Sequence, residues 1–151
     1  DTYYINRDDE DNNYITGMEP NTTVDDFLSN LKNERENLKV YESTETNVVE
    51  NEENVKTKYI VKLVINNITY DQLNLVVKGD IDGDGYITVA DVTLAENSIL
   101  RLSKLDKIEF VAADIDVDNY VTVADVTKMQ NYILRLNSSL NTDLYEQLEN
   151  K

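Results

Sequence analysis

Residues 80–102 read DIDGDGYITVADVTLAENSILRL, and residues 114–136 read DIDVDNYVTVADVTKMQNYILRL. The two stretches are offset by 34 residues and are identical at 16 of 23 aligned positions. Self-similarity at a fixed spacing is the sequence sign of an internal repeat. The chain therefore contains one sequence unit that occurs twice.

Each copy begins with a loop that carries aspartates at positions 1, 3, 5 and 12, a backbone carbonyl at 7 and a hydroxyl at 9. Oxygen donors in this order suit Ca²⁺, whose coordination is flexible, better than Mg²⁺, which needs a tight octahedron. The expected ligands of the first site are Asp80, Asp82, Asp84, the carbonyl of Tyr86, Thr88 through water, and Asp91. Those of the second site are Asp114, Asp116, Asp118, the carbonyl of Tyr120, Thr122 and Asp125.

The alternative is that these are acidic surface loops that bind nothing. It is disfavoured because four converging carboxylates repel one another unless a cation lies among them. Position 6 of each loop needs a positive φ, which Gly85 adopts without cost and Asn119 adopts less easily. We therefore expect two calcium sites, the second weaker than the first, and we expect calcium binding to be coupled to folding.

The segments after the loops have helical periodicity. An apolar stripe in each helix is interpreted as core that packs the two helices together; its members are Val92, Ala95, Ile99 and Leu102, and Val126, Met129, Ile133 and Leu136. A second set of residues along each helix should face outward. We interpret these residues as a recognition face, and the alternative is ordinary helix surface. That face comprises Val89, Ala90, Thr93, Asn97, Leu100 and Arg101, repeated as Val123, Ala124, Thr127, Asn131, Leu134 and Arg135.

No entering helix precedes the first loop, since residues 73–77 have the apolar pattern of a strand, and loop position 12 is Asp rather than Glu. A duplicated, EF-hand-like loop followed only by its exit helix resembles a dockerin, here over roughly residues 78–142. The resemblance implies an all-α module of two calcium loop-helix repeats that binds a cohesin domain of a scaffold or cell-surface protein, 1:1 and calcium-dependently. Both copies have Val-Ala where family members that bind the best-known cohesins have hydroxyl residues, which indicates a more apolar contact. The near-identity of the copies allows two binding orientations.

Residues 1–77 are expected to form a separate small α+β module. Strands are predicted near residues 3–5, 14–16, 38–41, 57–65 and 68–77, with a tight turn at Asn66-Asn67. A helix is predicted after Thr22 or Thr23, with Asp25 and Asp26 in its first turn. Residues 15–28 resemble the X modules that precede dockerins in cellulosome-like proteins. Such a module is a spacer that stabilises the dockerin or, alternatively, also contacts the cohesin. Residues 143–151 are expected to be a C-terminal tail with a short helix.

Composition limits the possible functions. The net charge is −16, which disfavours nucleic acid or an anionic membrane as a partner. The chain has no Cys and no His, so nucleophiles and transition-metal sites that use them are excluded. We expect no enzyme activity, because the ordered aspartates are committed to metal and neither part is large enough for a substrate cleft.

The sequence begins without Met and has no apolar run long enough to span a membrane. We expect it to be the C-terminal part of a longer secreted protein that includes modules for polysaccharide degradation or another activity. The alternative function is a calcium-stabilised structural, surface-attachment or polysaccharide-binding module whose partner is not a cohesin.

Overall fold

A five-stranded mixed sheet forms the first part of the chain in the computed structural model, which describes residues 3–150. Its strands are β1 (Tyr4–Asn6), β2 (Tyr14–Thr16), β3 (Leu38–Tyr41), β4 (Ile60–Ile65) and β5 (Ile68–Val76), in the order β1-β2-β5-β4-β3. The β2–β5 pair is parallel and the other pairs are antiparallel. Helix α1 (Val24–Ser29) follows β2, and short 3₁₀ turns lie at Glu10–Asn12 and Arg35–Asn37. The order of elements agrees with the sequence prediction for this part.

Two local signals that the sequence offered here are confirmed. The side chain of Thr23 accepts a hydrogen bond from Asp26 N at 3.1 Å and so caps α1. At the β4–β5 turn, Asn66 and Asn67 have φ of 53° and 64°. Two successive positive φ angles give the turn that matches the twist of a hairpin, and Asn tolerates them well.

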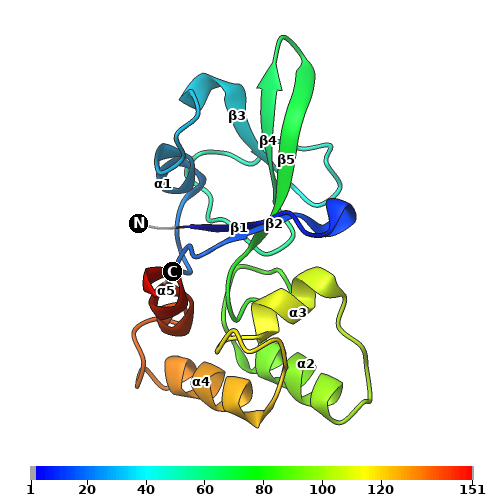
Figure 1. Cartoon of the computed structure of the whole chain (residues 1–151), viewed down its shortest axis with the longest axis vertical. Helices are drawn as coiled ribbons and strands as arrows, with labels where there is room; N and C mark the ends of the chain where they lie inside the picture. Colours follow the sequence, from blue (N-terminus) through cyan, green and yellow to red (C-terminus); the bar gives the residue numbers. More distant parts are fainter. Residues whose placement is uncertain (1–2, 151) are drawn as a thin grey trace.

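Four helices follow the sheet, namely α2 (Val89–Ile99), α3 (Lys107–Ala113), α4 (Val123–Ile133) and α5 (Thr142–Glu149). Thr88 and Thr122 cap α2 and α4, and each capping box is completed by the aspartate three residues later. Figure 1 shows α2 and α4 side by side at the end of the molecule opposite the β4–β5 hairpin, with α3 between them and the sheet. No helix within residues 3–150 is both long enough and apolar enough to cross a membrane.

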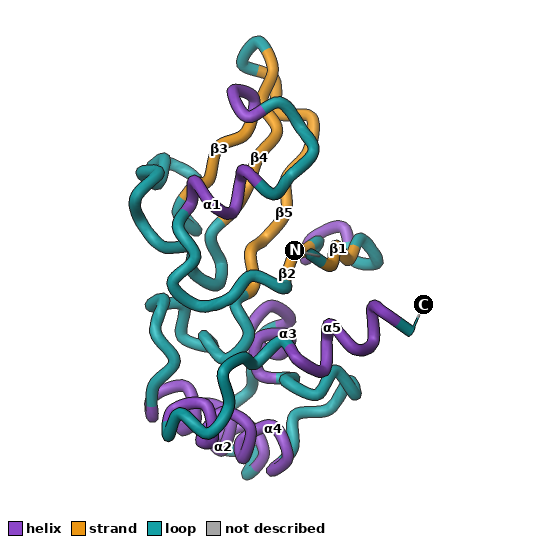
Figure 2. Tube along the Cα trace, turned by 90° about the vertical axis from the view of Figure 1, so that its left-hand side faces the viewer, coloured by secondary structure: helices purple, strands orange, loops and turns teal. Residues whose placement is uncertain are grey.

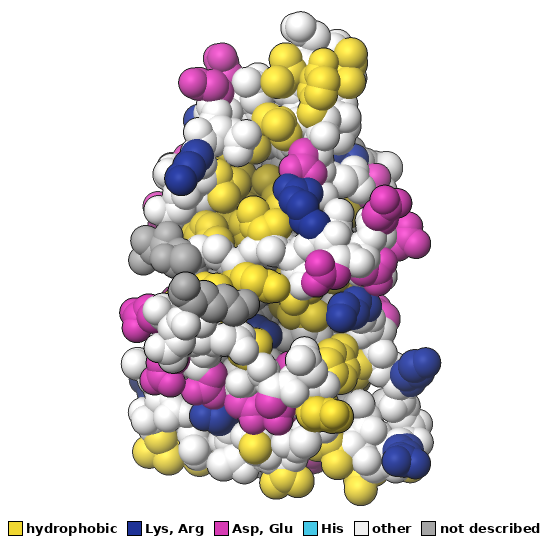
Figure 3. Space-filling model, in the orientation of Figure 1, with side chains coloured by type: hydrophobic (Ala, Val, Ile, Leu, Met, Phe, Trp, Pro, Cys, Tyr) yellow, Lys and Arg dark blue, Asp and Glu magenta, His cyan; other side chains and the backbone are white. Residues whose placement is uncertain are grey.

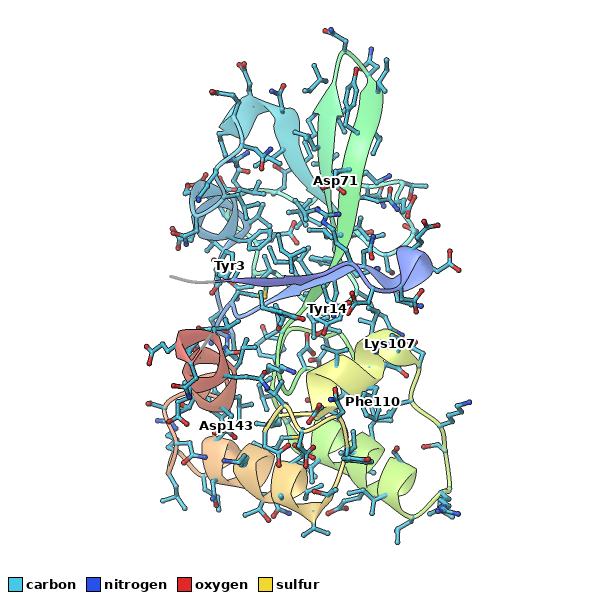
Figure 4. All side chains as sticks on the ribbon, in the orientation of Figure 1. Tyr3, Tyr14, Asp71, Lys107, Phe110 and Asp143 are labelled. Atoms are coloured by element: carbon cyan, nitrogen blue, oxygen red, sulfur yellow. The ribbon has the colours of Figure 1, made fainter. Side chains whose placement is uncertain are left out.

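The two parts share strand β5. Val77, the residue after β5, belongs to the core under the sheet with Phe27 and Leu75. Its neighbour Val76 points the other way and belongs to the core of the helices, with Met129. Tyr14 of β2 also packs against this second core, and Figure 4 shows its position between the sheet and the helices.

The predicted fold class is therefore wrong in its second half. The calcium-loop region is not an all-α unit that follows an α+β unit, because its core includes residues of β5 and β2 and its first loop continues directly from β5. The side view in Figure 2 shows the chain descending from β5 into the helical end without a linker. Sequence periodicity identified the helices but could not show that the sheet contributes to their core.

Helix α5 connects the end of the chain to its beginning. Tyr145 donates a hydrogen bond from its hydroxyl to the carbonyl of Gly17 at 2.5 Å, and Asn141 Nδ2 donates to Met18 O at 3.2 Å. Asp143, labelled in Figure 4, forms an ion pair with Lys128 of α4 at 3.1 Å. The C-terminal segment thus joins the sheet part to α4.

Candidate calcium loops and docking face

The first loop brings four carboxylates together. Asp80, Asp82, Asp84 and Asp91 each place one oxygen so that all four lie within 4.8 Å of one another. Asp80 and Asp91 are fully buried, whereas Asp82 and Asp84 are exposed. A cation held here would therefore have a buried side against the protein and an open side toward solvent.

The second loop repeats this arrangement. Asp114, Asp116, Asp118 and Asp125 also place one oxygen each within 4.8 Å of the others, with Asp114 and Asp125 buried. The eight predicted aspartates therefore gather in two groups of four. The predicted carbonyl ligands belong to Tyr86 and Tyr120, whose amides donate to Asp84 and Asp118 at 2.8 and 2.9 Å.

The aspartate at loop position 12 also closes its loop. Asp91 Oδ1 accepts hydrogen bonds from Ile81 N at 2.8 Å and Asp82 N at 3.1 Å, and Oδ2 accepts from Thr88 N at 2.9 Å. Asp125 repeats all three bonds within its own loop. The carboxylate thus joins the start of the loop to the start of the helix. The hydroxyls of Thr88 and Thr122 accept from Ala90 N and Ala124 N, which places both at helix N-termini.

Two positions of each loop adopt left-handed backbone. They are Gly83 and Gly85 in the first loop, with φ of 74° and 88°, and Val117 and Asn119 in the second, with φ of 59° and 69°. The sequence indicated this conformation at position 6 only. A β-branched residue such as Val117 is rare in this region, so the second loop has the more strained backbone.

The electrostatics of both loops favour a bound cation. Burial raises the pKa of Asp80 to about 7, against backbone hydrogen bonds from Thr57 and Gly85 that lower it. Burial, with the neighbouring aspartates, likewise raises the pKa of Asp116 to about 7 and of Asp91 to about 6. Asp116 Oδ1 is also buried without a hydrogen-bond partner. A divalent cation would satisfy this oxygen and offset the repulsion, so the donor set fits Ca²⁺.

The predicted recognition face lies on the outer side of α2 and α4. Val89 and Leu100 are each 67% exposed, and so are Val123 and Leu134 at the equivalent positions. Of the remaining predicted residues, Ala90, Thr93, Arg101, Ala124, Thr127 and Arg135 are exposed, and Asn97 and Asn131 are partly buried. Figure 3 shows hydrophobic side chains along the edge formed by these helices.

Two residues predicted as core lie outside it. Val92, Ala95, Val126 and Met129 are buried as predicted, but Leu102 and Leu136 are 74% and 70% exposed. The helices end at Ile99 and Ile133, and the backbone then reverses through Arg101 and Arg135, which have φ of 60° and 62°. The 3.6-residue period no longer applies beyond the helix end, so both leucines extend the exposed apolar face.

The family model described as the Dockerin type I domain matches residues 78–134. These residues form a dockerin module. The matched span contains both aspartate clusters and both helices of the exposed face. Dockerins are non-catalytic modules for calcium-dependent protein–protein docking, and proteins that carry them are typically extracellular or on the cell surface. No curated protein and no solved structure matches the chain.

Lys78 lies between β5 and the first loop, and its structural role was not predicted from the sequence. Its side chain is 3% exposed, and Nζ donates to the carbonyls of Val111 at 2.7 Å and Asp114 at 2.9 Å. Burial lowers its pKa to about 8, against the aspartates of the second loop, which raise it. Its position directly after the apolar run of residues 75–77 was the available signal.

Proposed function

We propose that this chain docks a secreted multimodular protein onto a cohesin domain of a scaffold or cell-surface protein. Docking uses the outer faces of α2 and α4 and requires calcium. The observation that carries the proposal is the matched exposure of equivalent apolar side chains, Val89 with Val123 and Leu100 with Leu134. Exposed apolar side chains that gather on one face are typical of a protein interaction site.

Bound calcium would stabilise this face by fixing the N-terminal turns of α2 and α4. Asp91 and Asp125 belong to the metal clusters and also accept hydrogen bonds from the amides that begin α2 and α4. A bound ion in each cluster would fix the first turn of the helix that bears the face. Loss of both ions would release the loops and disturb the relative position of the helices, so binding should fail in chelator.

The two faces are similar enough for docking in two orientations related by the internal repeat. Equivalent positions have nearly equal exposures in both copies. The surroundings differ, because Lys128 of α4 pairs with Asp143, whereas the equivalent residue of α2 is Leu94. A cohesin that reaches beyond the central face would distinguish the two orientations.

In this proposal residues 1–77 are an X-type spacer module, residues 78–142 the dockerin and residues 143–151 a helical tail. Support for the spacer role comes from the close packing of β5 and β2 against the helices, which fixes the sheet relative to the docking face. The protein would act outside the cell in a cellulosome-like assembly, and catalytic or binding modules would belong to the parent protein.

The test is a pull-down from secreted and surface proteins of the source organism with the chain immobilised, in calcium and in chelator. Retention of one cohesin-bearing scaffold protein only in calcium is the expected result. Polysaccharide pull-downs run in parallel test the non-cohesin alternative. Retention of a wall polymer, with no protein retained, would contradict the proposal.

A further inference from the structure

The two dockerin loops differ in what covers them. A segment of the sheet part, Lys56–Lys58, lies across the first loop, and we call it the strap. Thr57 donates its backbone N–H to Asp80 Oδ2 at 3.0 Å, so the first ligand of loop one is held by a residue 23 positions earlier. Asp114, at the same position of loop two, accepts amide hydrogen bonds from Asp118 and Asn119 of its own loop.

The strap is anchored on both sides. Thr57 is 2% exposed; its Oγ1 accepts from Val77 N at 3.0 Å and lies 3.2 Å from Val77 O, to which it donates. Lys58 donates its amide to Leu75 O at 2.9 Å. Lys58 Nζ reaches Asp106 at 2.7 Å and Glu109 at 2.9 Å, the pair that caps α3. The strap thus joins the end of β5, loop one and the start of α3.

The strap also explains the glycines of loop one. A Cβ at Gly83 would lie 2.9 Å from the carbonyl oxygen of Thr57, and one at Gly85 would lie 3.1 Å from Cγ of Lys56. Loop two has Val117 and Asn119 at these positions with the same sign of φ. Left-handed backbone alone therefore does not require glycine here, whereas the strap leaves no space for a side chain at position 4 of loop one.

We propose that the strap makes Thr57 a positioning residue for calcium in loop one, so that this site and the sheet part fold and bind calcium as one coupled unit. Loop two binds calcium without a strap. It is held from outside the loop mainly by Lys78 Nζ, which donates to the backbone carbonyl of Asp114. Linkage makes the coupling reciprocal: calcium in loop one orders the strap, and an ordered strap raises the calcium affinity of loop one. The inference rests on the proposed calcium sites and gives a structural reason for the inequality expected between them.

The test reads each loop separately. Asp116→Asn with Asp118→Asn removes loop two as a calcium site, and Asp82→Asn with Asp84→Asn removes loop one. Thr57→Val is then introduced into both backgrounds, since it removes the hydroxyl anchor but touches neither loop's carboxylates. Calcium is titrated by calorimetry, and hydrogen exchange of residues 56–58 is followed with and without calcium.

With loop one alone active, Thr57→Val should weaken calcium binding by about fivefold, the value of the one neutral hydrogen bond by which the hydroxyl holds the Thr57 backbone N–H against Asp80. With loop two alone active, the change should stay below about twofold, which also shows that the variant folds. Calcium should slow exchange of the strap amides only where loop one is intact. Gly83→Ala in loop one and Val117→Ala in loop two form a second matched pair, and only the former should weaken binding.

Equal weakening in both backgrounds, or no weakening in either, would overturn the coupling while leaving the calcium sites in place. The coupling would also be overturned if calcium in loop one did not change the hydrogen exchange of residues 56–58. If neither background bound calcium, the proposed calcium function would fall together with the strap. Failure of the coupling and failure of calcium binding therefore give different results in this experiment.

Discussion

Alanine substitutions of Leu100 and Leu134, singly and together, test the docking face. Each side chain is 67% exposed and lies just past the end of its helix, where its backbone N–H bonds the preceding turn. Fully burying a leucine is worth about 2 kcal/mol, so burying the exposed two thirds is worth roughly 1.3 kcal/mol, or about tenfold in Kd.

The pattern of the three variants distinguishes the modes of docking. If both orientations are used, either single variant leaves one intact orientation and should weaken cohesin binding by only about twofold, whereas the double variant should lose about tenfold or more. If one orientation dominates, one single variant should reproduce the loss of the double variant. Affinities are measured by calorimetry in calcium.

Thermal unfolding is the control for this experiment. Exposed leucines contribute little to folding, so the free energy of unfolding of each variant should stay within about 0.5 kcal/mol of the parent. A double variant that folds normally and binds cohesin as tightly as the parent chain would refute the assignment of the face.

Three further predictions concern the sites and the core. In chelator, the melting temperature should fall as the pH rises from about 4 to about 7, because Asp80 and Asp116 have folded-state pKa values of about 7 against an ordinary 3.8, so the folded state binds the extra protons and loses their stabilisation on deprotonation. A melting temperature that rose over this interval in calorimetric scans would contradict the assignment. Calcium at about 100 times its Kd should stabilise the chain by roughly 2.7 kcal/mol per site, and Asp84→Asn should remove one such increment in calcium titrations of the unfolding temperature. Phe27→Ala, at a fully buried position, should cost about 3–5 kcal/mol in denaturant unfolding, whereas Ile68→Ala, at a position 55% exposed, should cost less than about 0.5 kcal/mol; equal costs would be inconsistent with the described core.

The sequence was most informative where structure is local and repeated. Aspartates at fixed loop positions gathered in two clusters, and Val92 and Met129 are buried as their spacing predicts. The capping threonines and the Asn66-Asn67 turn also follow from short-range chemistry. These features depend on neighbours within one turn or one loop, which a sequence pattern records directly.

Long-range contacts could not be predicted in the same way. The parallel pairing of β2 with β5, and the division of Val76 and Val77 between two cores, depend on how the sheet is assembled. The strap includes Thr57 and Lys58, which the sequence predicts as the start of a strand that in fact begins at Ile60, and the contact of Thr57 with Asp80 spans 23 residues. The all-α class predicted for the calcium-loop region was wrong for this reason.

Titration of the chain with purified cohesin domains of different classes, in calcium and then in chelator, is the direct test of calcium-dependent docking. We predict saturation at 1:1 with at least one cohesin in calcium, complete loss of binding in chelator, and about tenfold weaker binding after combined alanine substitution of Leu100 and Leu134. Cohesin binding that persisted in chelator, or no binding to any cohesin by a chain whose melting temperature still rises with calcium, would contradict it.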